Sequence, residues 1–125
     1  MSGEEKENAF KKLVTYELTT PEFLKRLQSS DDAEEGEVAS LFCEVIGDPV
    51  PEITWFTEEG EEIRTNDHYQ MSYDLQTGRA ELKIKKILIS DEQSYKCVAS
   101  NVHGSPKTIG VLVIKSKSFL SEVLD

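Results

Sequence analysis

The chain has 125 residues, which is enough for one domain with short extensions. Its 24 acidic and 14 basic side chains give a formal net charge of −10, and the sequence pI is near 4.7. Because such a protein repels a phosphate backbone, we expect no nucleic-acid partner and favour proteins that present basic surfaces.

The sequence carries no signal for export or for a membrane. The segment formed by the first seven residues is acidic as a whole, and no apolar segment of a signal peptide follows it. The longest apolar run, residues 109–114, is too short to cross a bilayer, and no asparagine begins an Asn-x-Ser/Thr acceptor. These features predict a cytosolic protein in which Cys43 and Cys97 are packed thiols; origin from a secreted parent would remove that expectation.

Residues 1–20 are predicted to form an acidic leader outside the domain. Phe10, Leu13 and Val14 fit one face of a helix, whereas Val14 and Tyr16 also alternate as they would in a strand. Two interpretations stay open, a solvated leader and a partly helical segment that docks on a partner or on a neighbouring domain.

The domain is predicted to begin with an edge strand at Pro21 and Phe23, where a missing backbone N–H is tolerated. The competing interpretation is a helix that starts with Thr20 as its N-cap and proline in its first turn. Residues 29–36 are predicted to be a polar turn in which Gly36 takes a positive φ.

From residue 37 onward, short segments of alternating apolar and polar residues recur between turn sequences, which predicts an all-β domain. Turns are expected at 47–51, 58–62 and 76–79, and Ile63 is expected to restart a short strand. The side chains predicted to face inward include Ala39, Leu41, Val45, Ile53, Ile84 and Ile87.

Two cysteines, the only tryptophan and one tyrosine form a spaced frame. Trp55 follows Cys43 after one loop, and Tyr95 precedes Cys97 by two positions. This frame is typical of an immunoglobulin sandwich, in which a cysteine stands on each of two facing strands and the tryptophan packs between them. It predicts two packed antiparallel sheets. The expected structural core is Cys43, Trp55, Leu82, Tyr95, Cys97 and Leu112.

Further residues extend this frame along the chain. In order they are Pro21-x-Phe23, Ala39-x-Leu41-x-Cys43-x-Val45, Gly47-x-Pro49-x-Pro51-x-x-x-Trp55, Leu82-x-Ile84-x-x-Ile87, Asp91-x-x-x-Tyr95-x-Cys97-x-Ala99-x-Asn101-x-x-Gly104 and Leu112-x-Ile114. With them the chain resembles an immunoglobulin domain of the I-set, and it is similar to the intracellular modules of titin, myosin-binding protein C, palladin and the telokin end of myosin light-chain kinase. The resemblance implies a leader at 1–20, an I-set domain at 21–115 and a tail at 116–125. Residues 28–33 depart from the family pattern, because they lack the apolar residue of the second half of the first strand.

The residues do not indicate catalysis, a cofactor or a metal. The glycines show no phosphate-loop spacing, and the cysteines show no metal-ligand spacing. His68 and His103 stand singly in separate loops and are expected to be structural or solvated. The acidic residues between 31 and 37 lack the spacing of an EF-hand loop and are interpreted as a solvated turn.

Binding is therefore expected on the outside of the sandwich. Five apolar residues should point away from the core, namely Phe56, Val98, Ile109, Val111 and Val113. Such a sheet face is normally polar, so a contiguous apolar patch would mark a contact surface. Two other interpretations stay open: Lys96, Lys107 or the leader covers these residues, or the last strand pairs with a strand of a partner.

The resemblance implies a non-catalytic protein-binding and scaffolding module of an intracellular muscle or cytoskeletal protein, located at the sarcomere or the actin–myosin cytoskeleton. The expected partners are a filament protein, a giant sarcomeric protein, or neighbouring immunoglobulin or fibronectin domains, with no membrane involved. One alternative is an extracellular adhesion or receptor domain. Another is a free-standing, telokin-like regulator of myosin.

Overall fold

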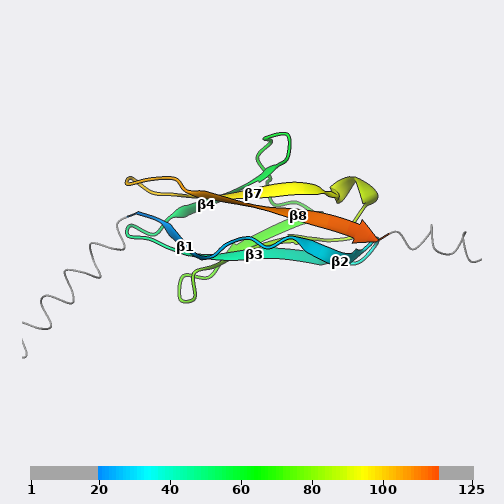
Figure 1. Ribbon diagram of the computed structural model, residues 1–125, viewed down its shortest axis with the longest axis horizontal. Helices are drawn as coiled ribbons and strands as arrows, with labels where there is room; N and C mark the ends of the chain where they lie inside the picture. Colours follow the sequence, from blue (N-terminus) through cyan, green and yellow to red (C-terminus); the bar gives the residue numbers. More distant parts are fainter. Residues whose placement is uncertain (1–19, 116–125) are drawn as a thin grey trace, which may run out of the picture.

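The computed structural model of the chain describes residues 20–115, and the described part forms a sandwich of two four-stranded sheets (Figure 1). The first sheet has the order β1-β3-β6-β5 and contains β1 (Glu22–Lys25), β3 (Ala39–Ile46), β6 (Arg79–Ile84) and β5 (Tyr69–Tyr73). The second has the order β2-β8-β7-β4 and contains β2 (Ser30–Glu34), β8 (Lys107–Lys115), β7 (Gln93–Ser100) and β4 (Glu52–Thr57). The predicted all-β, two-sheet immunoglobulin fold is confirmed. The predictions for the leader and the tail lie outside the described residues, apart from Thr20.

The edge strand predicted at Pro21 and Phe23 is present as β1, which pairs antiparallel with β3. It begins near one end of the long axis, and β8 ends near the other (Figure 1). Because the pairing of β1 engages only one of its sides, a proline at its start removes no bond from the interior of the sheet. The competing interpretation, a helix that starts at Thr20, is wrong.

The polar turn predicted for residues 29–36 is wrong over most of its length. Residues 30–34 form β2, which runs parallel to β8, so one strand pair of the sandwich is not antiparallel. Main-chain hydrogen bonds can hold a strand whatever its side chains are. The Ala33 side chain of β2 also packs in the core. The turn is confined to the residues around Gly36, whose φ is 87°.

The strand predicted to restart at Ile63 is reduced to a single bridge between Phe56 and Glu62. Ile63 is buried and donates its N–H to the carbonyl of Trp55 over 2.8 Å. Just beyond, the Asn66 side chain accepts the backbone N–H groups of His68 and Tyr69, which stabilises a local turn before β5.

The six residues expected in the core are all fully or almost fully buried between the sheets. Cys43 on β3 and Cys97 on β7 are free thiols whose Sγ atoms lie 3.6 Å apart. Trp55, on the strand beside Cys97, packs in the same cluster. Burial of these large side chains joins the two layers and makes the outer faces of the sheets rigid supports.

A tyrosine corner closes one end of the core. The hydroxyl of Tyr95 donates to the carbonyl of Asp91 over 2.7 Å, within the turn that includes the 3-10 helix η1 (Ile89–Asp91). The buried carboxylate of Asp91 accepts the N–H of Leu88, and both of its oxygens lie 2.9 Å from Nε2 of His68. His68 is therefore a structural residue, which is one of the two interpretations given for it from the sequence.

Candidate protein-binding surface

The outer face of β8 carries an apolar stripe that no residue between 20 and 115 covers; whether the leader covers it lies outside the described residues. Alternate residues of this strand point inward and outward, so Gly110 and Leu112 are buried while Val111 between them faces solvent. Ile109, Val111 and Val113 are 56%, 40% and 42% exposed. We call these three residues the β8 stripe.

The other two predicted surface residues lie on the neighbouring strands of the same sheet. Phe56 on β4 is half-buried, because the Nζ of Lys96 lies 4.9 Å above its ring in a cation–π contact. Lys96 also pairs with Ile109 across the β7–β8 ladder. Val98 is half-buried and stands opposite Lys107. The structure thus places all five residues on one sheet, but only the stripe on β8 is exposed.

The rim of the β8 stripe is polar and carries both signs of charge. Ser94 pairs with Val111, and its hydroxyl donates to the Glu58 carboxylate over 3.1 Å. Beyond Val113, the Glu92 carboxylate accepts the backbone N–H of Ile114. Acidic groups therefore flank one part of the stripe, whereas lysines flank the part around Ile109. Such a rim orients a charged partner without adding much binding energy.

In the other sheet the ring of Phe42 is covered, whereas Leu24 on the edge strand β1 is 56% exposed. The guanidinium of Arg79 lies 3.7 Å above the ring of Phe42, and the Nζ of Lys25 lies 4.8 Å from it. Glu81 accepts hydrogen bonds from Ser40 and Arg79 on this face. The bond from Ser40 and the positive charge of Arg79 lower the pKa of the Glu81 carboxyl. Cations thus cover the aromatic ring of this sheet, and its exposed Leu24 stands singly, whereas the β8 stripe groups three exposed aliphatic side chains on one strand.

The alternative in which the last strand accepts a partner strand is wrong. β8 is an inner strand, with β7 on one side and β2 on the other. The segment just before β2 also contacts β8. Leu27 donates its N–H to the side chain of Thr108, and Val111 donates its N–H to the side chain of Ser29. β7 lies on one side of β8, and β2 with the segment that leads into it lies on the other, so a partner would meet mainly the outward side chains of β8.

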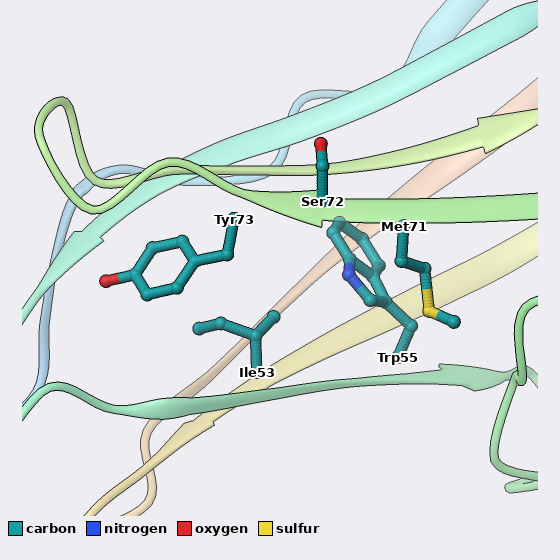
Figure 2. A pocket seen from close by; sticks show the side chains of 5 residues that line it. All are labelled: Ile53, Trp55, Met71, Ser72 and Tyr73. Carbon is teal, nitrogen blue, oxygen red and sulfur yellow. The ribbon is translucent and has the colours of Figure 1, made fainter.

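A second surface feature was not predicted from the sequence. A groove of about 230 Å³ lies between β4 and β5, which are edge strands of different sheets. It is lined by Ile53, Trp55, Met71, Ser72 and Tyr73 (Figure 2). Trp55 was assigned to the core alone, and the alternation pattern does not reveal which edge strands face each other across the sandwich.

Within residues 20–115, no three His, Cys, Asp or Glu side chains come together as metal ligands. The same part of the chain contains no helix that is long and apolar enough to cross a membrane.

Comparison with known proteins agrees with this architecture. Residues 21–114 match the immunoglobulin I-set domain family. A titin homolog of Caenorhabditis elegans is 41% identical over 85 residues, which are 68% of this chain but 0% of that protein to the nearest percent. The muscle M-line assembly protein unc-89 of the same organism is 33% identical over 88 residues, 70% of this chain and 1% of its own length. The chain thus spans only a small part of these relatives.

Two further comparisons cover more of the matched protein. Telokin of Meleagris gallopavo is 31% identical over 114 residues, which are 90% of this chain and 72% of telokin. The solved structure of titin domains z1z2 in complex with telethonin has a TM-score of 0.72 and 31% identity, and the match covers 79% of this chain and 49% of that one. The chain therefore belongs to the immunoglobulin I-set family, as part of a group whose relatives include muscle proteins.

Proposed function

We propose that this chain is a non-catalytic protein-binding and scaffolding module of a muscle or cytoskeletal protein, and that it binds its partner through the β8 stripe. The observation that supports the proposal is the group of three exposed aliphatic side chains on one strand. Apolar rings are covered by cations on both sheets, at Phe42 and at Phe56, whereas the three aliphatic side chains of β8 are left open.

The expected contact is between two folded surfaces. Inner strands hold the stripe, so the side chains are already arranged before binding and little conformational entropy is lost. Burial of Ile109, Val111 and Val113 would supply the apolar centre of the contact, and the charged rim would set its orientation. The partner in this proposal is a filament protein, a giant sarcomeric protein, or a neighbouring immunoglobulin or fibronectin domain. The corresponding location is the sarcomere or cytoskeleton.

The similarity to muscle proteins supports this choice of partner. The titin domains that resemble this chain were solved in complex with telethonin, which shows that related domains bind other proteins. A net charge of −10 favours partners with basic surfaces.

Two matched variants test the surface. Val111→Lys places a charge in the centre of the stripe, whereas Val102→Lys makes the same change at a loop residue that is 85% exposed. Both sites face solvent, so both variants should fold, which circular dichroism would verify. In pull-downs from muscle extract, we expect a sarcomeric or actomyosin protein to be retained by the wild type and by Val102→Lys but lost with Val111→Lys.

Either of two results would contradict the proposal. Recovery of no myosin, actin or giant sarcomeric protein by the wild type would remove the proposed class of partner. Equal recovery by both lysine variants would remove the β8 stripe as the surface.

The extent of the telokin match favours a second candidate, a telokin-like regulator of myosin, because the chain covers 72% of that protein. Co-sedimentation with purified myosin filaments tests it directly. Binding that saturates at a fixed ratio to myosin would support this candidate, and absence of the chain from the pellet would exclude it.

A further inference from the structure

The groove between β4 and β5 is formed by two strand edges that face each other. β5 is the last strand of one sheet and β4 the last of the other, so the sandwich is open on this side. Ile53 and Trp55 line the groove from β4, and Met71, Ser72 and Tyr73 line it from β5 (Figure 2).

The floor of the groove holds a hydrogen-bond donor without an acceptor. Trp55 is only 1% exposed, and its Nε1 has no hydrogen-bond partner among the described residues. Figure 2 shows this nitrogen on the side of the indole that faces Ile53 and Tyr73. The hydroxyl of Tyr73 is directed to the carbonyl of Val45 and does not satisfy it. A buried donor of this kind favours any occupant that brings an acceptor.

The edge of β5 also presents backbone groups that have no partner within residues 20–115. Lys85 donates to the carbonyl of His68, and Asp74 donates to the carbonyl of Arg79, so the even-numbered residues of this strand bond to β6. The backbone groups of Tyr69, Met71 and Tyr73 therefore point away from the sheet.

Part of this edge is already occupied. Asn66 covers Tyr69, because its side chain accepts the N–H of Tyr69 and its own N–H donates to the carbonyl of Tyr69. Across the groove, Ile63 donates to the carbonyl of Trp55 and closes that part of β4. The free stretch of edge is therefore at Met71 and Tyr73, directly beside the groove.

We propose that the groove binds an extended peptide segment of a partner protein, which adds to β5 as a further strand and inserts a glutamine or asparagine side chain toward Trp55. The added strand would pair with the backbone of Met71 and Tyr73, and the side-chain amide oxygen would accept the indole N–H. Glu52, which directly precedes Ile53, and Asp74, which directly follows Tyr73, favour lysine or arginine next to the inserted residue. This site is separate from the β8 stripe.

Nuclear magnetic resonance of the ¹⁵N-labelled full chain tests this proposal with defined peptides. The probe is acetyl-Lys-Thr-Gln-Thr-Lys-amide, and the matched peptide replaces Gln by Leu. Trp55 is the only tryptophan, so the single indole N–H resonance reports on the floor of the groove. We expect this resonance to shift, the Met71 and Tyr73 amides to exchange more slowly, and the Gln peptide to bind about tenfold more tightly than the Leu peptide.

Backbone pairing is tested by N-methylation of the probe. One variant carries methyl groups on the backbone nitrogens of the two threonines, and the other carries them on the backbone nitrogens of the glutamine and the lysines. Because alternate N–H groups of a strand point to opposite sides, only one of these peptides should lose binding. Equal binding by both would overturn strand addition.

Protein variants separate this site from the β8 stripe. Val111→Lys should leave peptide binding unchanged, whereas Trp55→Phe should remove the preference for Gln over Leu, read from the Met71 and Tyr73 amides. Tyr73→Phe removes a hydroxyl group from the same groove but keeps Trp55, so it should keep the preference. If Trp55→Phe does not fold, the preference of the wild type and of Tyr73→Phe for Gln over Leu still tests the proposal.

Several results would overturn the proposal. They are no indole shift with peptide up to about 10 mM, equal affinity for the Gln and Leu peptides, an equal shift with acetamide alone, and a shift that depends on protein concentration without peptide. The last two would assign the groove to a small molecule or to a second copy of the chain.

Discussion

Replacing Tyr95 by phenylalanine removes one hydroxyl group from the closed end of the core. This hydroxyl donates to the carbonyl of Asp91 over 2.7 Å, and Tyr95 is fully buried. The Tyr95→Phe variant leaves that carbonyl without its partner in a place that water does not reach. We therefore expect the free energy of unfolding to fall by about 1–3 kcal/mol.

Tyr73→Phe is the matched control. Its hydroxyl also donates to a backbone carbonyl, that of Val45, over 2.9 Å, but Tyr73 is half-buried beside an open groove. Water can replace this bond, so the expected loss is about 0.5–1 kcal/mol. Urea denaturation followed by the fluorescence of the single tryptophan measures both losses. A difference of about 1 kcal/mol between the variants corresponds to roughly 4–8 °C in Tm for a domain of this size.

The pH dependence of stability gives a second measurement on the same residue. Burial, with the charges of Tyr69 and Asp91, raises the pKa of Tyr95 in the folded chain. An unfolded tyrosine ionises near pH 10, so the unfolded state loses its proton first and stability falls as the pH rises above about 10. Tyr95→Phe should weaken this alkaline loss. An equal cost for both variants at neutral pH, or an unchanged alkaline loss in Tyr95→Phe, would refute the reasoning.

Three further predictions follow from the described contacts. Gly110→Ala should lower stability by about 1–3 kcal/mol in urea denaturation, because a Cβ there would lie 2.9 Å from the carbonyl oxygen of Gln28; an unchanged midpoint would contradict the close approach of that segment to β8. Ser40→Ala should raise the pKa of Glu81 in a carboxyl titration by nuclear magnetic resonance, since the bond from Ser40 is the largest cause of its lowering. The stability that this carboxylate contributes is lost as the pH falls through its folded pKa, so the variant should lose it at higher pH. The two buried cysteines should react with a thiol reagent only after unfolding, giving two thiols per chain in protein taken from its natural compartment; a count of zero would favour the extracellular alternative.

The core could be predicted because its signals are local and carry a period of two. Cys43, Trp55 and Cys97 each stand in a segment where alternate residues are apolar, and the pattern alone fixes which side faces inward. β2 could not be predicted in this way. Its sequence Ser-Asp-Asp-Ala-Glu shows no apolar alternation, and main-chain bonds to β8 hold it in place.

The candidate surface could be predicted only in part. Alternation predicts that Val111 and Phe56 face outward, but it does not say which of them is covered. The cation over Phe56 comes from Lys96, far along the chain, and the cation over Phe42 comes from Arg79. These contacts depend on the register between strands that are distant in sequence. Such a register is a property of the folded sheets and not of any one segment.

The groove depends on topology in the same way. Ile53 and Tyr73 read as ordinary strand residues, and nothing near them in the sequence indicates that their strands are the facing edges of two sheets. The unpaired donor of Trp55 is equally hidden, because tryptophan in this frame is expected in the core. A sequence signal for such a site would need to predict the order of strands in both sheets.

The two proposed surfaces present different groups, and this difference decides what each can bind. β8 lies between two strands, so a partner meets mainly its outward side chains and must bring a folded surface that matches the stripe. At β5 the backbone of Met71 and Tyr73 is open, so an extended segment can pair with it and needs only one suitable side chain for the groove. A folded domain and an extended segment therefore would not compete for the same groups. A single small domain with both surfaces can hold two proteins together, which is the physical meaning of a scaffold.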